Sequence, residues 1–259
     1  MSAPDQDLFD LTGKVAVVTG GSRGLGREMC LAFARHGASV VVASRKVDAC
    51  IALAEEITET TGQKAIGVAC HVGRWADCDN LVATANETFG KIDVLVNNAG
   101  MSPLYPNLSA ITEDLYDKVI GVNLKGPFRL SALVGEQMAV GEGGSIINVS
   151  SVASVQPSSV EIPYVTAKAG LNCLTVALSH ALGPKVRVNT IMPGPFLTDI
   201  SKAWDLEDFH KRAKAFIPLQ RGGEADEIVG AALYLASRAS SYTSGAIIKI
   251  DGGAAFGSA

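Results

Sequence analysis

The sequence predicts an α/β fold in which a doubly wound parallel sheet of seven strands is covered by helices on both faces. Short runs rich in β-branched residues alternate with longer helical patterns along the whole chain. The short runs are almost entirely apolar, as is typical of strands buried on both faces of a parallel sheet. Neither a linker-like composition break nor an internal repeat divides the 259 residues. We therefore expect a single domain spanning residues 1–259.

The elements follow in regular order. The predicted strands are Val15–Thr19, Ser39–Ala43, Ala65–Ala69, Val94–Val96, Ser145–Val149, Val186–Ile191 and Ala246–Ile250. The predicted helices are Gly24–His36, Val47–Thr61, Ala76–Phe89, Glu113–Met138, Glu161–Leu182 and Glu224–Ala236. Right-handed crossovers place the carboxyl ends of such strands at one edge, where a ligand is expected to bind at the point of reversed strand order.

Two segments depart from this alternation. Residues 1–12 precede the first strand and are expected to form an N-terminal extension. Between Pro193 and Pro218 the sequence has no clear period and holds Trp204, Phe209 and Phe216 among charges. We interpret residues 195–218 as a mobile flap over the substrate.

Composition and charge argue against several classes of partner. The chain has 22 basic and 26 acidic residues and no basic cluster, which makes a nucleic-acid partner unexpected. Its apolar runs are far shorter than the ~20 residues that cross a bilayer, so no membrane association is expected. The acidic start of the chain is unlike a signal peptide, which favours the cytoplasm.

The cysteines do not indicate a disulfide framework or a metal centre. All five are widely spread, and none form a Cys-x-x-Cys pair. Cys70, His71 and Cys78 lack a fourth ligand at a suitable spacing. We therefore expect reduced thiols and no metal.

The first strand-to-helix junction, Thr19–Gly26, is expected to bind a diphosphate. Glycines allow the backbone to approach the anion closely, and the free N–H groups at a helix N-terminus attract negative charge. The spacing Gly-x-x-x-Gly-x-Gly departs from the Gly-x-Gly-x-x-Gly template, and Arg27-Glu28 excludes a P-loop. Alone, the segment is also compatible with a merely tight turn. The candidate binding residues are Gly20, Ser22, Arg23, Gly24, Leu25 and Gly26.

The end of the second strand favours NADP over NAD. An NAD site usually has a carboxylate here for the ribose 2′-hydroxyl, whereas a 2′-phosphate requires cations and hydroxyl donors. This strand ends in Ser44, Arg45 and Lys46, with no carboxylate before Asp48. Arg23 is placed to approach the same phosphate from the glycine loop. The alternative is that these charges are only a solvated strand end.

Polar residues follow the fourth and fifth strands and the helix after them. Asn98, Ala99 and Gly100 follow the fourth strand, where small residues and amides are able to line a ribose, although the segment is also compatible with a turn. Ser151 follows the fifth strand. A serine hydrolase is excluded there because no Gly-x-Ser-x-Gly turn surrounds it.

A tyrosine and a lysine complete the pattern. Tyr164 and Lys168 are four residues apart, so a helix places both on one face. An ammonium group near a phenol, close to an oxidised nicotinamide, is expected to lower the pKa of Tyr164 and make it a usable proton donor and acceptor. In isolation this spacing is common and favours a structural role; its coincidence with the other motifs favours a catalytic one.

Together these residues resemble the short-chain dehydrogenase/reductase family in its compact, single-domain, Rossmann-type form. The resemblance runs from Gly13 to Gly253 and keeps the family order and spacing of motifs. It implies that Tyr164 gives a proton to a carbonyl as hydride arrives from the nicotinamide, and that Ser151 polarises that carbonyl. It further implies that Lys168 holds the nicotinamide ribose while Asn123 positions a water leading to Lys168.

The resemblance adds further cofactor contacts and two departures. It assigns the nicotinamide side to Pro193, Gly194, Phe196 and Thr198, and the adenine side to His71 and Val72. The family usually has Asp where this chain has His71, which puts the adenine contact in doubt. The helix after Asn123 ends in acids, Glu136 and Glu142, and not in the bases that would meet an acidic acyl carrier.

The expected function is that of an NADP-dependent carbonyl reductase or alcohol dehydrogenase, acting on CH–OH and C=O groups as a cytoplasmic homotetramer. One alternative is a 3-ketoacyl reductase acting on an acyl carrier protein or CoA. Another, from a different class, is a non-catalytic NADP-sensing regulator. An apolar substrate pocket is expected from Met101–Tyr105, Val152–Val155, Val160, Pro195, Phe196, Trp204 and Phe209.

Overall fold

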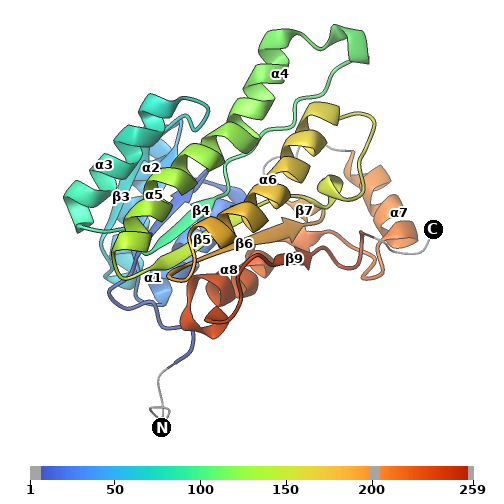
Figure 1. Ribbon diagram of the computed structural model, residues 1–259. Helices are drawn as coiled ribbons and strands as arrows, with labels where there is room; N and C mark the ends of the chain where they lie inside the picture. The colour runs from blue at the N-terminus through green and yellow to red at the C-terminus, as the bar shows by residue number, and fades with distance from the viewer. Residues whose placement is uncertain (1–6, 199–204, 256–259) are drawn as a thin grey trace.

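A parallel sheet of seven strands, in the order β3-β2-β1-β4-β5-β6-β9, forms the centre of the computed structural model, which describes residues 7–198 and 205–255 (Figure 1). The doubly wound fold predicted from the sequence is confirmed. The strands are β1 (Val15–Thr19), β2 (Ser39–Ser44), β3 (Ala65–Ala69), β4 (Val94–Asn97), β5 (Gly144–Val149), β6 (Val186–Pro193) and β9 (Ile247–Ile250).

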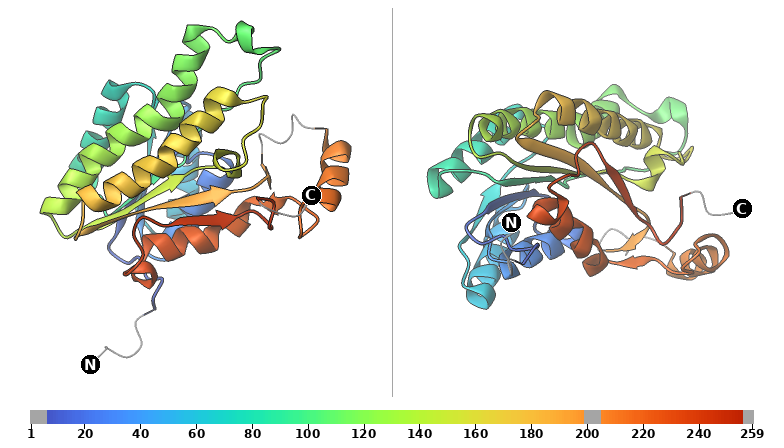
Figure 2. Two further views of the ribbon diagram at one scale, coloured as in Figure 1. Left: turned by 45° about the vertical axis from the view of Figure 1, so that its right-hand side comes forward. Right: turned by 60° about the horizontal axis from the view of Figure 1, so that its bottom comes forward.

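Helices cover both faces of the sheet (Figure 2). One face carries α3 (Trp75–Phe89), α4 (Glu113–Ile120), α5 (Gly126–Val140) and α6 (Ile162–Ala181). The other carries α1 (Gly24–Arg35), α2 (Val47–Thr61) and α8 (Val229–Ala236). Because the strands are apolar on both sides, two separate hydrophobic cores fill the layers between sheet and helices.

The strand order reverses between β1 and β4, which are paired in parallel through Val17 and Leu95. From β1 the chain winds outward to β3, and from β4 it winds in the opposite direction to β9. The carboxyl ends of β1 and β4 therefore flank the crevice where doubly wound folds bind ligands.

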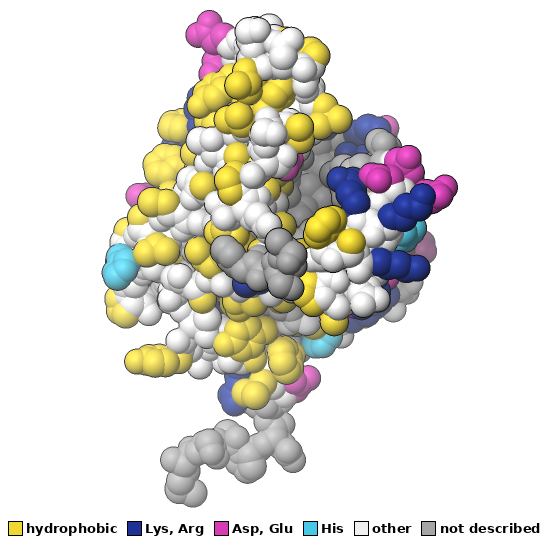
Figure 3. Space-filling view, turned by 90° about the vertical axis from the view of Figure 1, so that its right-hand side faces the viewer, with side chains coloured by type: hydrophobic (Ala, Val, Ile, Leu, Met, Phe, Trp, Pro, Cys, Tyr) yellow, Lys and Arg dark blue, Asp and Glu magenta, His cyan; other side chains and the backbone are white. Residues whose placement is uncertain are grey.

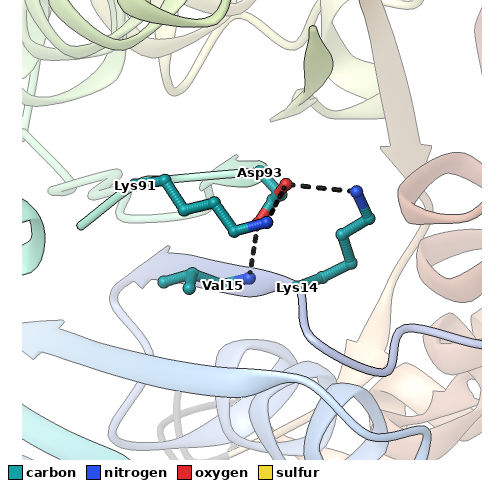
Figure 4. Close-up of polar contacts among 4 residues, drawn as sticks. All are labelled: Lys14, Val15, Lys91 and Asp93. Carbon is teal, nitrogen blue, oxygen red and sulfur yellow. Dashed lines mark hydrogen bonds and ion pairs between the residues drawn. The ribbon is translucent and has the colours of Figure 1, made fainter. Parts of the chain in front are cut away.

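The opposite edge of the sheet is held by one buried carboxylate, that of Asp93 (Figure 4). Its Oδ2 accepts the backbone N–H of Val15 at 2.9 Å. Its Oδ1 lies 3.2 Å from the Nζ atoms of both Lys14 and Lys91. These contacts join the start of β1 to the start of β4, and each buried polar atom of the carboxylate has a partner.

The single helix expected over Glu113–Met138 is interrupted by a π-helical turn at Gly121–Lys125. Asn123 lies in this turn, and its Nδ2 donates to the carbonyls of Val119 at 2.9 Å and Met101 at 2.8 Å. The side-chain amide thus joins the π-helical turn to the loop that follows β4. Hydrophobic periodicity alone does not reveal such a turn.

The segment expected to be an irregular flap is instead partly regular. A helix, α7 (Leu206–Phe216), begins at Asp205, whose carboxylate accepts the N–H groups of Glu207 and Asp208. Phe209, Ala213 and Ile217 form a small core of their own beneath it. Two short strands, β7 (Phe196–Leu197) and β8 (Gly223–Glu224), pair beside it. Trp204 lies outside the described residues.

The expected N-terminal extension contacts the domain through Leu8 and Leu11, while residues 7–10 are exposed. Leu11 is 1% exposed, and the carbonyl of Leu8 accepts the N–H of Ala239 at 3.2 Å. In the part of the chain that the structure describes, no helix combines the length and apolar character needed to cross a membrane.

Candidate active site

The glycine loop after β1 leaves no room for side chains at two of its positions. A Cβ on Gly20, where φ is +62°, would lie 2.9 Å from both Cα of Ala99 and Nδ2 of Asn98. A Cβ on Gly26 would lie 2.3 Å from the carbonyl oxygen of Gly20. Side chains at these positions would push the loop away from β4, so glycine keeps the backbone open to an anion at the start of α1.

Thr19, which the sequence reasoning did not single out, joins this loop to β4. Its Oγ1 donates to the carbonyl of Val96 at 3.2 Å and accepts the N–H groups of Asn98 and Ala99 at 3.1 and 3.2 Å. Asn98 returns the contact through Nδ2, which donates to the carbonyls of Thr19 and Gly20. The signal was a hydroxyl at the last position of a buried apolar strand.

The residues expected to favour a 2′-phosphate gather beside the loop. The Ser22 hydroxyl donates to Oγ of Ser44 at 3.0 Å. Arg23, Arg45 and Lys46 are exposed. None of these three cations forms an ion pair with another described residue. The cluster therefore offers hydroxyl donors and uncompensated positive charge, the chemistry that a phosphate monoester requires.

The four predicted catalytic residues come from three elements that meet at the carboxyl ends of β4 and β5. Ser151 follows β5, Tyr164 and Lys168 lie on α6, and Asn123 lies in the π-helical turn. A Cβ on Gly100 would lie 3.1 Å from Oδ1 of Asn123 and 3.6 Å from Nζ of Lys168, so this small residue is needed where they converge. Nζ of Lys168 donates to the Val149 carbonyl at 2.7 Å.

The expected lowering of the Tyr164 pKa is not found in the protein alone. Burial raises the pKa of Tyr164 to about 12, a hydrogen bond with Ser151 lowers it, and the charge of Glu161 raises it further. Lys168 does not offset this, because its Nζ lies 5.7 Å from the centre of the Tyr164 ring and is directed to Val149. Burial also lowers the pKa of Lys168 to about 8. Tyr164 is thus protonated near neutral pH.

The remaining predicted residues lie on both sides of this centre. Pro193 ends β6, and the side chain of Thr198 lies against the glycine loop, 3.5 Å from where a Cβ on Gly24 would stand. Gly194 packs on Asp251. Phe196 is buried, and its ring packs on Gly223.

The adenine-side candidates lie after β3. His71 is half-buried, and its Nδ1 accepts the backbone N–H of Gly73 at 3.2 Å. The backbone N–H of His71 donates to Oδ2 of Asp77 at 2.9 Å. Val72 is buried, and its carbonyl lies against Gly126. The side chain of Leu25 packs on a hydrophobic core, so its loop contributes through backbone atoms.

A narrow crevice borders Tyr164 and includes a charged residue that the sequence reasoning did not select, Glu161. The crevice is lined by Pro103, Tyr105, Leu115, Val119, Glu161, Pro163 and Tyr164. The crevice shares Pro103 and Tyr105 with the expected apolar substrate pocket, and its lining also includes the charged residue Glu161. Among residues 7–198 and 205–255, no group of three or more His, Cys, Asp or Glu side chains is arranged to hold a metal ion.

Figure 3 looks onto the edge of the molecule where these residues lie. Charged side chains gather over α7 on one side of this face, and hydrophobic side chains gather over the loop before α4 on the other. Leu104 and Leu108, which precede α4, and Tyr116, which lies on α4, are exposed hydrophobic residues.

Comparisons with known proteins agree with this geometry. Residues 14–208 match the family model described as short chain dehydrogenase. An L-rhamnose 1-dehydrogenase (NAD(P)(+)) of Azotobacter vinelandii is 39% identical over 251 residues, which cover 94% of this chain and 97% of the relative. A structure of a short-chain type dehydrogenase/reductase from Mycobacterium marinum is 35% identical, with a TM-score of 0.89 over 96% of this chain and 98% of its own.

L-sorbose reductase from Gluconobacter frateurii, solved with NADPH and L-sorbose, is 28% identical, with a TM-score of 0.90 over 96% of this chain and 99% of its own. These similarities extend over nearly the full length of the chain, and the family model covers the glycine loop as well as Ser151, Tyr164 and Lys168. The protein therefore belongs to the short-chain dehydrogenase/reductase family of oxidoreductases.

Proposed function

We propose that the protein is an NADP(H)-dependent reductase of carbonyl groups, or the dehydrogenase of the corresponding secondary alcohols, with Tyr164 as the general acid and base. The observation that carries this proposal is the convergence of Asn123, Ser151, Tyr164 and Lys168 on one point at the carboxyl edge of the sheet. Among the proteins that resemble this chain, one is an L-rhamnose 1-dehydrogenase and another is an L-sorbose reductase.

The side chains fit the chemistry of reduction. When bound, the reduced nicotinamide supplies hydride to the carbonyl carbon. Ser151 donates a hydrogen bond to the carbonyl oxygen and polarises it, and the Tyr164 hydroxyl transfers its proton to that oxygen. Because the pKa of Tyr164 is about 12, the hydroxyl holds this proton at neutral pH. Lys168 and Asn123 orient the ribose and the proton path from solvent.

NADP is the proposed cofactor because of the charges beside the glycine loop. Gly20 and Gly26 keep the diphosphate cradle free of side chains. Ser44, Arg45 and Arg23 would bind the 2′-phosphate, and the first carboxylate after β2 is that of Asp48, within α2. NAD is the less favoured alternative.

A homotetramer in the cytoplasm is the proposed assembly and location. Helices α5 and α6 expose apolar side chains, with Phe128 at 44%, Val140 at 84% and Val176 at 41%. Small residues on α6, among them Ala169 and Gly170, permit close approach of another helix. These exposed faces support association between copies of the chain.

A 3-ketoacyl reductase that meets an acyl carrier protein is less well supported. Two bases, Lys125 and Arg129, lie near the start of α5, and both stand over the ring of Trp75. Arg129 also pairs with Asp79 at 2.7 Å, so its charge is already compensated. The end of α5 exposes acids.

A non-catalytic NADP-sensing regulator is also less well supported, because such a protein has no need of Ser151 and Tyr164 together.

Two measurements test this proposal. In a thermal-shift titration, NADPH should raise the apparent stability more than NADH at equal concentration, because it binds the folded state more tightly. A screen of ketones with NADPH should find turnover that Tyr164→Phe lowers about a thousandfold, while the NADPH shift persists. Turnover retained by Tyr164→Phe would refute the role of Tyr164, and a larger shift with NADH would refute the cofactor.

A further inference from the structure

The carboxylate of Glu161 lies at the start of α6, three residues before Tyr164, and lines the crevice beside it. Ser102 donates to Oε2 of Glu161 at 2.8 Å. Oε1 has no hydrogen-bond partner within residues 7–198 and 205–255, and the side chain does not cap the helix. One oxygen of the carboxylate is therefore held in place while the other remains available to a ligand.

The segment that carries Glu161 is fixed by the loop on the other side of the crevice. The Tyr105 hydroxyl donates to the Ser159 carbonyl at 3.3 Å and accepts the N–H of Ile162 at 2.8 Å. With the bond from Ser102, these contacts bind both sides of Glu161 to residues 102–105. A positioned carboxylate discriminates between ligands better than a freely rotating one, because less side-chain entropy is lost on binding.

Glu161 also determines the charge of this part of the site. Its charge raises the pKa of Tyr164, and the other residues lining the crevice carry no basic group. Nζ of Lys168, 5.7 Å from the centre of the Tyr164 ring, is directed to the Val149 carbonyl. The exposed cations Arg23, Arg45 and Lys46 lie instead at the glycine loop and after β2. A substrate that enters this crevice therefore meets the negative charge of Glu161 beside Tyr164.

Resting on the reductase activity proposed above, we propose that Glu161 is a specificity-determining residue. It selects carbonyl substrates that carry a hydrogen-bond donor, a hydroxyl or an ammonium group, near the reacting carbon, and it rejects those that carry a carboxylate there. A carboxylate only accepts hydrogen bonds, and bonds to a charged acceptor are stronger than neutral ones. An anionic substituent in the same place would face like charge and lose solvation.

The test uses four ketones of one skeleton, CH3–CO–CH2–X: butanone, hydroxyacetone, aminoacetone and acetoacetate. Each is measured as a competitive inhibitor of whichever carbonyl the full-length protein reduces in the screen above, so none needs to be turned over itself. The proteins are wild type, Glu161→Gln, which keeps an acceptor for Ser102, and Glu161→Ala. Glu142→Gln, an exposed acid before β5 at the far edge of the sheet, is the matched control.

In wild type and the control we expect hydroxyacetone and aminoacetone to inhibit about tenfold more strongly than butanone, and acetoacetate to be the weakest. In Glu161→Gln, aminoacetone should inhibit no more strongly than butanone, and acetoacetate should inhibit about tenfold more strongly than it inhibits the wild type. Loss of the negative charge should also lower the pKa of Tyr164, because Glu161 raises it. The alkaline limb of the pH profile of turnover should therefore lie at lower pH in Glu161→Gln than in wild type, a shift that a purely structural role would not produce.

The outcomes separate the two proposals. If the wild type reduces no carbonyl with NADPH, the reductase proposal fails and this inference fails with it. If it does reduce a carbonyl, but the order of the four inhibitors is the same in wild type and Glu161→Gln, the inference alone is overturned. Equal inhibition by all four ketones in the wild type would also overturn it.

Discussion

The two edges of the central sheet, formed by the amino and the carboxyl ends of its strands, differ in whether their charged side chains are paired. At the amino edge, Asp93 is compensated by Lys14, Lys91 and the backbone N–H of Val15 (Figure 4). At the carboxyl edge, Lys168 is buried beside a neutral carbonyl, and none of the described carboxylates pairs with it. Arg45 on the same edge is exposed and unpaired within the described chain.

The difference separates stability from function. Compensated charges at the amino edge stabilise the junction of β1 and β4, and have no capacity left for a ligand. Uncompensated groups at the carboxyl edge cost stability in the protein alone, and such groups are typical of binding and catalytic sites. Substitutions at the two edges should therefore have opposite consequences, and the following predictions test that contrast.

The largest loss of stability is expected at Asp93. Asp93→Ala leaves the Val15 N–H and two ammonium groups without their acceptor and should lower the free energy of unfolding by about 3 kcal/mol. Asp93→Asn keeps an acceptor for Val15 and should lose about half as much. Chemical denaturation measures both. If Asp93→Ala, kept folded at low temperature, lost turnover, the amino edge would contribute to catalysis as well as to stability.

The opposite sign is expected at Lys168. Burial lowers its pKa from 10.5 to about 8, so below pH 8 the folded protein bears the cost of a buried charge. Lys168→Met should raise the free energy of unfolding at pH 7 by about 2 kcal/mol, after allowing for the lost bond to Val149, while turnover disappears. Unfolding curves at pH 7 measure this change.

The lowered pKa of Lys168 also determines how the free energy of unfolding depends on pH. The unfolded chain holds the Lys168 proton up to about its ordinary pKa of 10.5, whereas the folded chain releases it near 8. Unfolded protein therefore binds more protons between these values, and stability from this group rises with pH across that window. The rise should be absent in Lys168→Met. An equal rise in both proteins would assign it to another group.

The smallest effect on stability is expected at Arg45. Arg45→Glu removes an exposed, unpaired cation and should change the free energy of unfolding by less than about 0.5 kcal/mol. Affinity for NADPH should fall about tenfold and that for NADH should hardly change, because only NADPH has the 2′-phosphate. Isothermal titration calorimetry with NADPH and NADH measures both affinities. Equal losses of affinity for the two nucleotides would mean that Arg45 does not bind the 2′-phosphate.

Much of the fold was predictable from the sequence because its strands are continuous apolar runs. Val40, Val41 and Val42 are fully buried, which is the reason their run could be recognised as an internal strand. The positions of Tyr164 and Lys168 followed from their spacing in a helix. Apolar runs and the spacing of residues in a helix are local features, so they can be recognised in a single sequence.

Features that do not show in hydrophobic periodicity or motif spacing were not predicted. The helix α7 was hidden by its charges, although Asp205 caps it and ion pairs join Glu207 to Lys211 and Asp208 to Arg212. In the protein alone the pKa of Tyr164 is raised, and spacing does not reveal that Lys168 reaches Val149; the lowering expected beside an oxidised nicotinamide stays a prediction. Glu161 carries no sequence signal, since the segment before α6 is irregular.

The separation of the two edges is tested most directly by measuring turnover and unfolding together in Asp93→Ala and Tyr164→Phe. We expect Asp93→Ala to lose about 3 kcal/mol of stability and keep its kcat, and Tyr164→Phe to lose kcat about a thousandfold and keep its stability within about 1 kcal/mol. If each variant lost both properties, the two edges would not be independent and the account would be contradicted.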